Sequence, residues 1–505
     1  AGGDACAVYG PDLGERLKAV TGGADIKLAI DAVAGDSTQH LADCLADGGV
    51  IEHDQIWRRI KLSLEIGAPE SVRRLAPRIG IAPAALRTAL QRPARAISNA
   101  TDPRLRVIAA VQLARQDPEQ AEERIAALAT LPRAERAFVI SQIAAQSMRR
   151  LLPQSLSLTH QALSASASDE TWAWLARAAL RESDWPTLHA IYQSMSPQAR
   201  SQPAWIYWHA RADRELGRPE EALEQLRTIA GQFNFYGMLA AEELGMPLQL
   251  PIAPEKPDAT QLAWVEKNPG ISRAMRFYEM GLRADGNREW NFALQAMGDR
   301  QLLAVAHWAC ARELLERCVN TAQRTQDEHD FRLRYITPFQ DRLTTYAQQH
   351  DLDPAWIYGL IRQESRFLLE ARSSARARGL MQIIPPTAKW IARKLGVRRF
   401  RLERLNELDT NLRFGTFYLK TVHDELDGSP VLASAGYNAG PGRPRRWRAT
   451  LQASLDGAAF AEIIPLQETR AYVKHVIANA AVYSALISEH PQSLKQWLGR
   501  IEPRQ

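Results

Sequence analysis

The strongest candidate for chemistry in this sequence is Glu364, a carboxylate on the apolar side of an expected helix. Asp353-Pro354 begins that helix with a side chain that caps free amides and a proline that tolerates the first turn. The apolar residues that follow recur at helical spacing and place Glu364 on the side that should be buried. Burial and the negative end of the helix dipole both disfavour a charged carboxylate. We therefore expect a raised pKa, which a general acid near neutral pH requires.

Taken alone, Glu364 is better explained by a structural role, either in a buried polar network or at a frayed, solvated helix end, than by catalysis. Four sequence blocks in a fixed order change this interpretation. The blocks are Gln363-Glu364-Ser365 followed by Ser373, Gly379 to Ala388 (GLMQIIPPTA), Ala435 to Gly442 (AGYNAGPG) and Ile464 to Val473 (IPLQETRAYV). Over about 110 residues they resemble the large soluble lytic murein transglycosylases, whose catalytic domain is similar to goose lysozyme. Asn234 to Gly237 and Glu289-Trp290 resemble features that this family has ahead of its catalytic domain.

The resemblance implies a role for residues in the first two blocks. Glu364 matches the single catalytic acid and base of the family, and Ser373 matches a polar group at the sugar site. Met381 and Gln382 match a motif that lines the substrate. Each has a plainer alternative, because Met381 suits core packing and Ser373 suits a helix cap or an ordinary surface position.

The last two blocks supply three more expected site residues. Tyr437 and Asn438 match a loop that closes over the sugar and the acid, and Glu468 matches a carboxylate at the rim of the cleft. The first two also precede Gly440-Pro441-Gly442, so a turn would explain them as well. Glu468 follows Pro465 near an expected helix start, where the helix dipole stabilises a carboxylate without any catalytic role.

Three positions depart from the family pattern. Ile384 stands where many relatives have Met, Pro386 where many have a small residue, and Arg376 where Gly is common. These differences affect the expected glycan contacts rather than the expected class of reaction.

The elements that must position these residues are almost all helices. Ala, Leu, Arg, Glu and Gln dominate, apolar residues recur every three or four positions, and alternating strand patterns are scarce. Residues 204–222 resemble a tetratricopeptide hairpin, and four prolines between 247 and 257 interrupt the helical pattern. We predict an all-α protein in three parts: a superhelical solenoid over 1–250, a small helical linker domain over 251–330 and a lysozyme-like catalytic domain over 331–505.

Composition excludes several other functions. With 63 basic and 57 acidic residues the net charge is +6, and no dense basic tract marks a nucleic-acid arm. Residues 1–4 lack the basic and apolar regions of a signal peptide, as those of a mature secreted protein would after its signal is removed. The apolar stretch from Val476 to Ile487 is too short and mixed to span a bilayer. The four cysteines show no zinc spacing. Cys6 and Cys44 could pair in an oxidising compartment, whereas Cys310 and Cys318 could pair only if a turn separates them.

The resemblance implies a periplasmic enzyme, at the outer membrane or cell wall, that cleaves peptidoglycan without water or any metal or organic cofactor. It would produce 1,6-anhydro-N-acetylmuramic acid ends. The alternatives are a lysozyme-type hydrolase, with Glu370, Asp409 or Glu468 as second carboxylate, and an inactive glycan-binding scaffold. The helical front would hold the glycan strand, dock a protein partner of cell-wall synthesis or hydrolysis, or do both.

Overall fold

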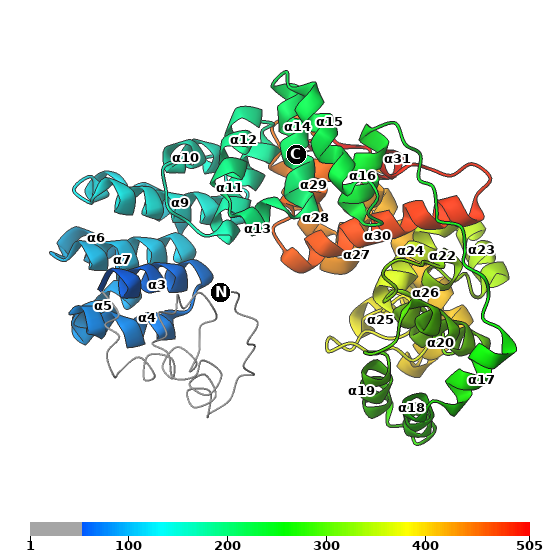
Figure 1. The fold of residues 1–505 in the computed structure, drawn as a ribbon. Coiled ribbons are helices and arrows are strands. Elements are labelled where there is room, and N and C mark those ends of the chain that lie inside the picture. Colours follow the sequence, from blue (N-terminus) through cyan, green and yellow to red (C-terminus); the bar gives the residue numbers. More distant parts are fainter. Residues whose placement is uncertain (1–52, 505) are drawn as a thin grey trace. The chain divides into compact units, whose positions relative to one another are not determined.

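A computed structural model describes residues 53–504 of the chain (Figure 1). These residues separate into two compact units, one that ends at Arg200 and one that begins at Ser201. Both units are helical, so the predicted all-α class is confirmed. The expected pair of Cys6 and Cys44 lies outside the described residues.

In the first unit, short helices follow one another and pack as sequence neighbours. Proline in the first turn and an Asp cap explain several starts: Asp102 caps α7 by accepting from Arg104 N, and Asp117 caps α8 by accepting from Gln120 N. The elements are α3 (His53–Ile66), α4 (Pro69–Leu75), η1 (Ala76–Ile79), α5 (Pro83–Gln91), α6 (Pro93–Asn99), α7 (Pro103–Gln116), α8 (Pro118–Glu122), η2 (Ala126–Leu128), α9 (Arg133–Arg149), α10 (Ser155–Ala162), α11 (Asp169–Arg181), α12 (Trp185–Ser194) and α13 (Pro197–Arg200).

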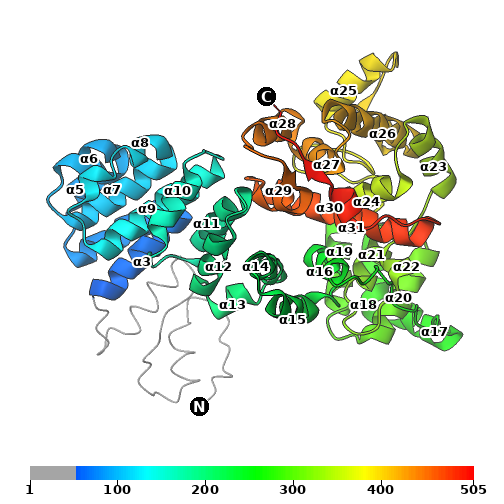
Figure 2. The same cartoon turned by 90° about the horizontal axis from the view of Figure 1, so that it is seen from above.

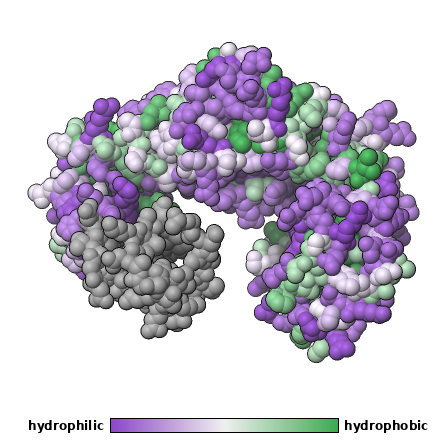
Figure 3. Space-filling model, viewed as in Figure 1, coloured by the Kyte–Doolittle hydropathy of each residue, from purple (hydrophilic) through white to green (hydrophobic). Residues whose placement is uncertain are grey.

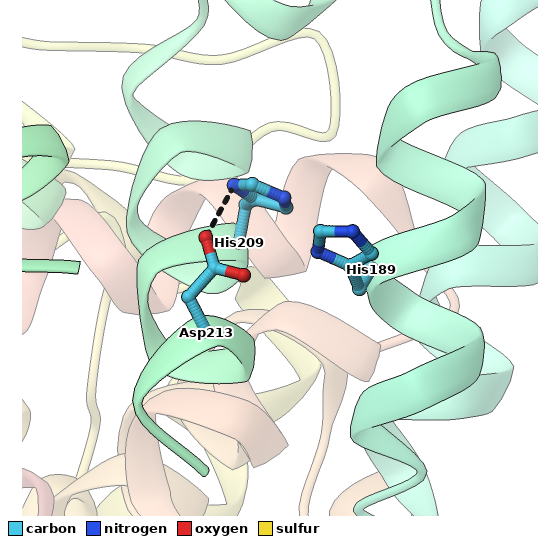
Figure 4. A group of neighbouring side chains, drawn as sticks. All are labelled: His189, His209 and Asp213. Atoms are coloured by element: carbon cyan, nitrogen blue, oxygen red, sulfur yellow. Dashed lines mark ion pairs between the residues drawn. The ribbon is translucent and has the colours of Figure 1, made fainter. Parts of the chain in front are cut away.

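The second unit begins with the predicted tetratricopeptide-like hairpin. It consists of α14 (Pro203–Glu215) and α15 (Pro219–Ile229), and α16 (Phe235–Glu243) follows. His209 and Asp213, one turn apart on α14, form an ion pair at 3.3 Å (Figure 4). Gln225 of α15 holds both groups, since its Nε2 donates to Asp213 Oδ2 at 2.7 Å and its Oε1 lies 2.6 Å from His209 Nδ1. This buried polar network fixes the two helices together.

Residues 246–258 contain no helix, as the four prolines predict. After them come α17 (Ala259–Lys267), α18 (Pro269–Glu279), α19 (Arg283–Ala293), α20 (Asp299–Ala311) and α21 (Leu315–Ala322). A turn separates α20 from α21, and it brings Cys310 and Cys318 to a Cα–Cα distance of 5.1 Å in a disulfide. The expectation that Cys310 and Cys318 pair only if a turn separates them is therefore confirmed. The boundaries near 250 and 330 remain predictions.

The remainder of the second unit carries the four blocks. Its elements are α22 (Phe331–Arg334), α23 (Gln340–Gln349), α24 (Pro354–Glu364), α25 (Pro385–Lys394), η3 (Leu402–Asn406), α26 (Leu408–Glu425), α27 (Pro430–Ala439), α28 (Gly442–Ala449), β1 (Leu455–Asp456), α29 (Gly457–Ile463), α30 (Gln467–Ile487), α31 (Leu494–Leu498) and β2 (Arg500–Ile501). The two strands pair antiparallel, with Leu455 opposite Ile501.

Among residues 53–504, no helix has the length and apolarity needed to cross a bilayer. The visible surface is mostly hydrophilic with separate hydrophobic patches (Figure 3). Phe292 and Met280 are among the large apolar side chains that are exposed, at 66% and 69%. Scattered exposure of this kind is ordinary for a folded protein.

Contact between α24 and α30 organises the region that holds Glu364, and Figure 2 shows α24 beside the long α30. The close approach depends on Gly359, because a Cβ there would lie 2.8 Å from the backbone nitrogen of Ala480 and 2.9 Å from the carbonyl oxygen of Val476. Asn479 joins the helices further: its Nδ2 donates to Gly359 O at 3.3 Å, and its Oδ1 accepts from Arg362 Nη1 at 3.2 Å. Only a residue without a side chain allows the two backbones to lie this close.

Replacing Gly359 with Ala should lower the free energy of unfolding by about 1–3 kcal/mol, because the helices must separate to admit the Cβ. Gly231 is the matched control, since a Cβ there meets nothing within 4 Å. Urea unfolding of the two variants gives the comparison. Equal stability of Gly359→Ala and Gly231→Ala would contradict the proposed role of the close approach.

Candidate functional site

Glu364 is the last residue of α24, and the structure explains its position. Asp353 caps the helix by accepting from Ala355 N at 2.7 Å, as the sequence predicts, and Pro354 occupies the first turn. Ile357, Leu360 and Ile361 are at most 1% exposed, which confirms the expected buried stripe. The chain leaves the helix through two left-handed residues, Arg366 and Phe367, with φ of 50° and 69°. Non-glycine residues in this region store strain, which clusters at functional sites.

Glu364 is half-buried. Within residues 53–504 its carboxyl has one direct hydrogen-bond donor, the Tyr472 hydroxyl, at 2.6 Å from Oε1. Burial raises the pKa of Glu364 to about 7, the hydrogen bond from Tyr472 lowers it, and the charge of Glu468 raises it. The acid is therefore partly protonated at neutral pH, and the same group can give a proton and later accept one.

Tyr472 was not predicted as a site residue, although it lies within the fourth block. It is 5% exposed and lies on α30 four residues after Glu468, so both residues share one face of the helix. Its pKa is raised well above the ordinary value by burial and by the nearby Glu364 charge. The signal in the sequence was this spacing from Glu468.

Glu468 is exposed in the first turn of α30, so the predicted helix start is confirmed. Its neighbour Thr469 donates from Oγ1 to Asn438 Oδ1 at 2.7 Å and so links α30 to the end of α27. Tyr437, beside Asn438, donates from its hydroxyl to the carbonyl oxygen of Met381 at 2.8 Å. Burial and the Glu364 charge raise the pKa of Tyr437 well above its ordinary value.

Three hydrogen bonds thus connect all four blocks. Glu364 is joined to Tyr472, Thr469 to Asn438, and Tyr437 to Met381. The segments concerned are separated by up to 108 residues along the chain. The order seen in the sequence therefore corresponds to one connected site.

The Met381 side chain is fully buried and packs against Gly415, where a Cβ would lie 2.1 Å from Met381 Sδ. Its carbonyl oxygen, rather than its side chain, contributes to the network. Gln382 is half-buried with a left-handed φ of 46°, and its Nε2 donates to Gly379 O at 2.8 Å and to Ala371 O at 3.1 Å. Both residues therefore shape the loop before α25.

Ser373 is exposed in the same loop, at its outer turn. Its Oγ accepts from Ala377 N at 3.1 Å and its own N donates to Ala377 O at 3.2 Å. The structure thus places Ser373 in a turn rather than at a helix cap. No contact between Ser373 and Glu364 is among those of the described residues.

Asn411, which was not predicted as a site residue, binds the backbone of the loop before α25 through its side-chain amide. The residue is fully buried on α26, its Oδ1 accepts from Met381 N at 2.8 Å, and its Nδ2 donates to Leu405 O and Arg378 O at 2.7 and 3.1 Å. Gly379 passes so near that a Cβ would lie 2.0 Å from Asn411 Nδ2. The sequence signal was an amide on the buried face of α26, most of whose residues are apolar.

Residues 342–458 match the family described as the transglycosylase SLT domain. The chain is 30% identical over 308 residues to a soluble lytic murein transglycosylase of Salmonella typhimurium, covering 61% of this chain and 47% of the relative. It is 28% identical over 326 residues to the Escherichia coli protein of that name, covering 64% and 50%. The chain thus spans about half the length of the curated relatives it matches.

Two solved structures are similar to this one. An inactive Glu-to-Gln mutant of the lytic transglycosylase Slt from Pseudomonas aeruginosa superposes with a TM-score of 0.74 at 28% identity, covering 98% of this chain and 81% of that one. The 70 kDa soluble lytic transglycosylase of Escherichia coli gives a TM-score of 0.69 at 24% identity, covering 93% and 78%, which shows the fold alone. The resemblance to large soluble lytic transglycosylases is therefore confirmed.

If Glu364 works as an acid, kcat/KM should fall about tenfold per pH unit above its pKa of about 7. Tyr472→Phe removes the hydrogen bond that lowers this pKa, so the alkaline limb should move to higher pH. Glu468→Gln removes a charge that raises it, so the limb should move to lower pH. Glu370→Gln is the control, because this exposed carboxylate is not among the causes of the shift. Identical limbs in all four proteins would exclude Glu364 as the titrating group.

The raised pKa also predicts how stability depends on pH. Folding favours the protonated Glu364, so its contribution is complete below the ordinary pKa of 4.5 and is lost as pH rises through about 7. Glu364→Gln cannot ionise and keeps its stability. Denaturant unfolding should show the variant about 1–3 kcal/mol more stable than the parent at about pH 8, and the gain should vanish at about pH 4. A variant less stable at the higher pH would contradict the assigned burial.

Proposed function

We propose that this chain is a peptidoglycan lytic transglycosylase in which Glu364 acts first as acid and then as base. The observation that carries the proposal is the carboxyl at the end of α24, with a pKa of about 7 and one oxygen held by Tyr472. The match of residues 342–458 to the transglycosylase SLT domain supports it, since this range includes Glu364. The inactive Glu-to-Gln form of the Pseudomonas aeruginosa protein supports a required Glu in such enzymes.

In the proposed reaction, the glycosidic oxygen between N-acetylmuramic acid and N-acetylglucosamine takes a proton from Glu364. The bond from that oxygen to C1 breaks, and the leaving sugar departs with a free hydroxyl. The carboxylate left on Glu364 then accepts the proton of the muramyl C6 hydroxyl, whose oxygen attacks C1 and closes the 1,6-anhydro ring. Glu364 ends protonated, as it began. Neither water, a metal nor an organic cofactor takes part, and one carboxylate serves for both proton transfers.

The hydrogen bond from Tyr472 fits this cycle. It occupies Oε1 and leaves Oε2 to carry the proton that moves. It also stabilises the carboxylate formed after the first transfer, because an ionised acceptor strengthens the bond. Burial raises the pKa of Glu364, whereas the hydrogen bond from Tyr472 lowers it. With a pKa of about 7, the carboxyl can change between its protonated and ionised forms near neutral pH.

The remaining predicted site residues, apart from the fully buried Met381, are proposed to contact the glycan. Tyr437 and Asn438 lie at the end of α27, and the Glu364 charge acts on Tyr437. Gln382 and Ser373 belong to the loop before α25, and Glu468 is exposed at the start of α30. Polar side chains from three segments would then surround the sugar, an arrangement typical of carbohydrate sites that fix orientation by hydrogen bonds.

A hydrolase on the same fold is the main alternative, and it requires a second carboxylate. Asp409 is exposed and bonds to Arg342 and Tyr346, whereas Glu468 acts electrostatically on Glu364. Glu468 is therefore the candidate that a hydrolytic mechanism would use.

We also propose a periplasmic location at the cell wall, with the glycan strand as the principal partner. The Cys310–Cys318 disulfide supports an oxidising compartment.

The three-part organisation into residues 1–250, 251–330 and 331–505 is proposed as well, with the helical front holding the strand, a cell-wall protein or both.

Digestion of purified peptidoglycan and mass spectrometry of the products tests this function. The expected muropeptides carry 1,6-anhydro ends, which are one water lighter than hydrolytic products. Glu364→Gln should reduce release by at least about a thousandfold while leaving the fold intact, because it removes both proton transfers. Reducing ends with added water would favour the hydrolase, and release that survives Glu364→Gln would contradict the assignment.

A further inference from the structure

Residues 234–237 begin α16, and the proposed reaction gives them no role. Asn234 caps the helix, because its Oδ1 accepts from Tyr236 N at 3.1 Å and from Gly237 N at 2.9 Å. The chain turns tightly here, so a Cβ on Gly237 would lie 2.1 Å from a backbone carbonyl oxygen of the preceding turn, and only glycine fits. Phe235 packs edge to face on Tyr236, with ring centroids 5.1 Å apart. The neighbours of Tyr236 in the chain thus fix where its side chain lies.

The Tyr236 hydroxyl connects α16 to helices that follow much later in the chain. It donates to Oε2 of Glu462 on α29, 226 residues away, and accepts from Trp208 Nε1 at 3.3 Å. Lys474 of α30 donates from Nζ to the same carboxylate oxygen at 2.8 Å, and its ammonium lies 5.1 Å from the centre of the Tyr236 ring. Tyr236, Glu462 and Trp208 are at most 6% exposed. A buried carboxylate is stable only with such partners, so the network holds α16, α29 and α30 together.

Helix α30 is therefore held on two sides. Lys474 follows Tyr472 by two residues, so their side chains leave the helix about 200° apart around its axis, since an α-helix has 3.6 residues per turn. Tyr472 reaches Glu364 at the end of α24, whereas Lys474 reaches Glu462 on α29. The helix packs against α16, α24 and α29, and Figure 2 shows α16 and α24 beside it. Contacts on opposite faces fix the rotation of α30 about its axis, which packing on one side alone does not.

We propose that Tyr236 is a positioning residue for the acid, because it fixes the rotation of α30 that brings the Tyr472 hydroxyl to Glu364. It acts through the carboxylate of Glu462 and the ammonium of Lys474. The proposal rests on the proposed function, in which Glu364 gives and then accepts a proton. A helix that precedes residues 331–505 thus sets the geometry of the acid without touching the glycan.

The pH profile of peptidoglycan cleavage by Tyr236→Phe, which removes only the hydroxyl, tests the proposal. We expect kcat to fall about five- to tenfold with KM changed less than about twofold, because the reacting groups lose their alignment. The alkaline limb should move to higher pH, towards that of Tyr472→Phe, because a weakened hydrogen bond lowers the pKa of Glu364 less. Tyr236 is not itself among the causes that act on this pKa, so the shift would arise from the position of α30.

Three further variants separate positioning from simple loss of stability. Tyr207→Phe is the matched control: it removes another buried hydroxyl, which donates to Glu243 at 3.1 Å, and should lower the thermal transition without moving the limb. Glu462→Gln keeps the shape of the network but weakens both of its bonds to the carboxylate, and should move the limb in the same direction as Tyr236→Phe. The double variant of Tyr236→Phe and Tyr472→Phe should have the limb of Tyr472→Phe alone, because the bond that α30 positions is then absent.

The possible failures are distinguishable. If the wild type forms 1,6-anhydro ends but Tyr236→Phe and Glu462→Gln lower the thermal transition without moving the limb, Tyr236 is only structural and the proposed function stands. A limb that Tyr207→Phe moves equally far would also overturn the inference, because any weakened packing would then have the same effect. If the wild type forms no 1,6-anhydro ends, the proposed function fails together with the inference.

Discussion

The site depends on the close packing of α24 on α30. Gly359 lets the two backbones approach, and this crossing brings the end of one helix to the early turns of the other. Glu364 and Tyr472, which are 108 residues apart in the chain, thereby come within hydrogen-bond distance. Two rigid helices hold the pair, so the geometry of the acid does not rely on a mobile loop.

Two further hydrogen bonds connect α30 to α27 and α27 to the loop before α25. Thr469 next to the start of α30 holds Asn438, and the adjacent Tyr437 holds the backbone of Met381. Asn411 binds the same segment, because its Oδ1 accepts a hydrogen bond from Met381 N. Removing Asn411 would leave the buried backbone nitrogen of Met381 without this acceptor, which costs more than the bond itself contributes.

The environment of Glu364 balances opposing effects. Burial and the charge of Glu468 favour the protonated carboxyl, while the Tyr472 hydroxyl favours the carboxylate. Together these effects place the pKa of Glu364 at about 7, so the carboxyl can exchange its proton near neutral pH. Partial burial of the Glu364 carboxylate is unfavourable, and the packing of α24 on α30 holds it there.

The sequence alone determined the helical class, the start of α24 at Asp353-Pro354, the buried stripe that carries Glu364 and the order of the four blocks. These features are local, since they follow from caps, spacing and residue type. The spacing of Cys310 and Cys318 also indicated that they could form a disulfide only if a turn separated them, and the turn between α20 and α21 does so. Tyr472 and Asn411 were not predicted, because their roles arise from partners far away in the chain. The buried position of the Met381 side chain and the turn at Ser373 were likewise decided by the tertiary structure. Spacing along one helix shows which face a residue occupies, whereas the group that faces it depends on how separate helices pack.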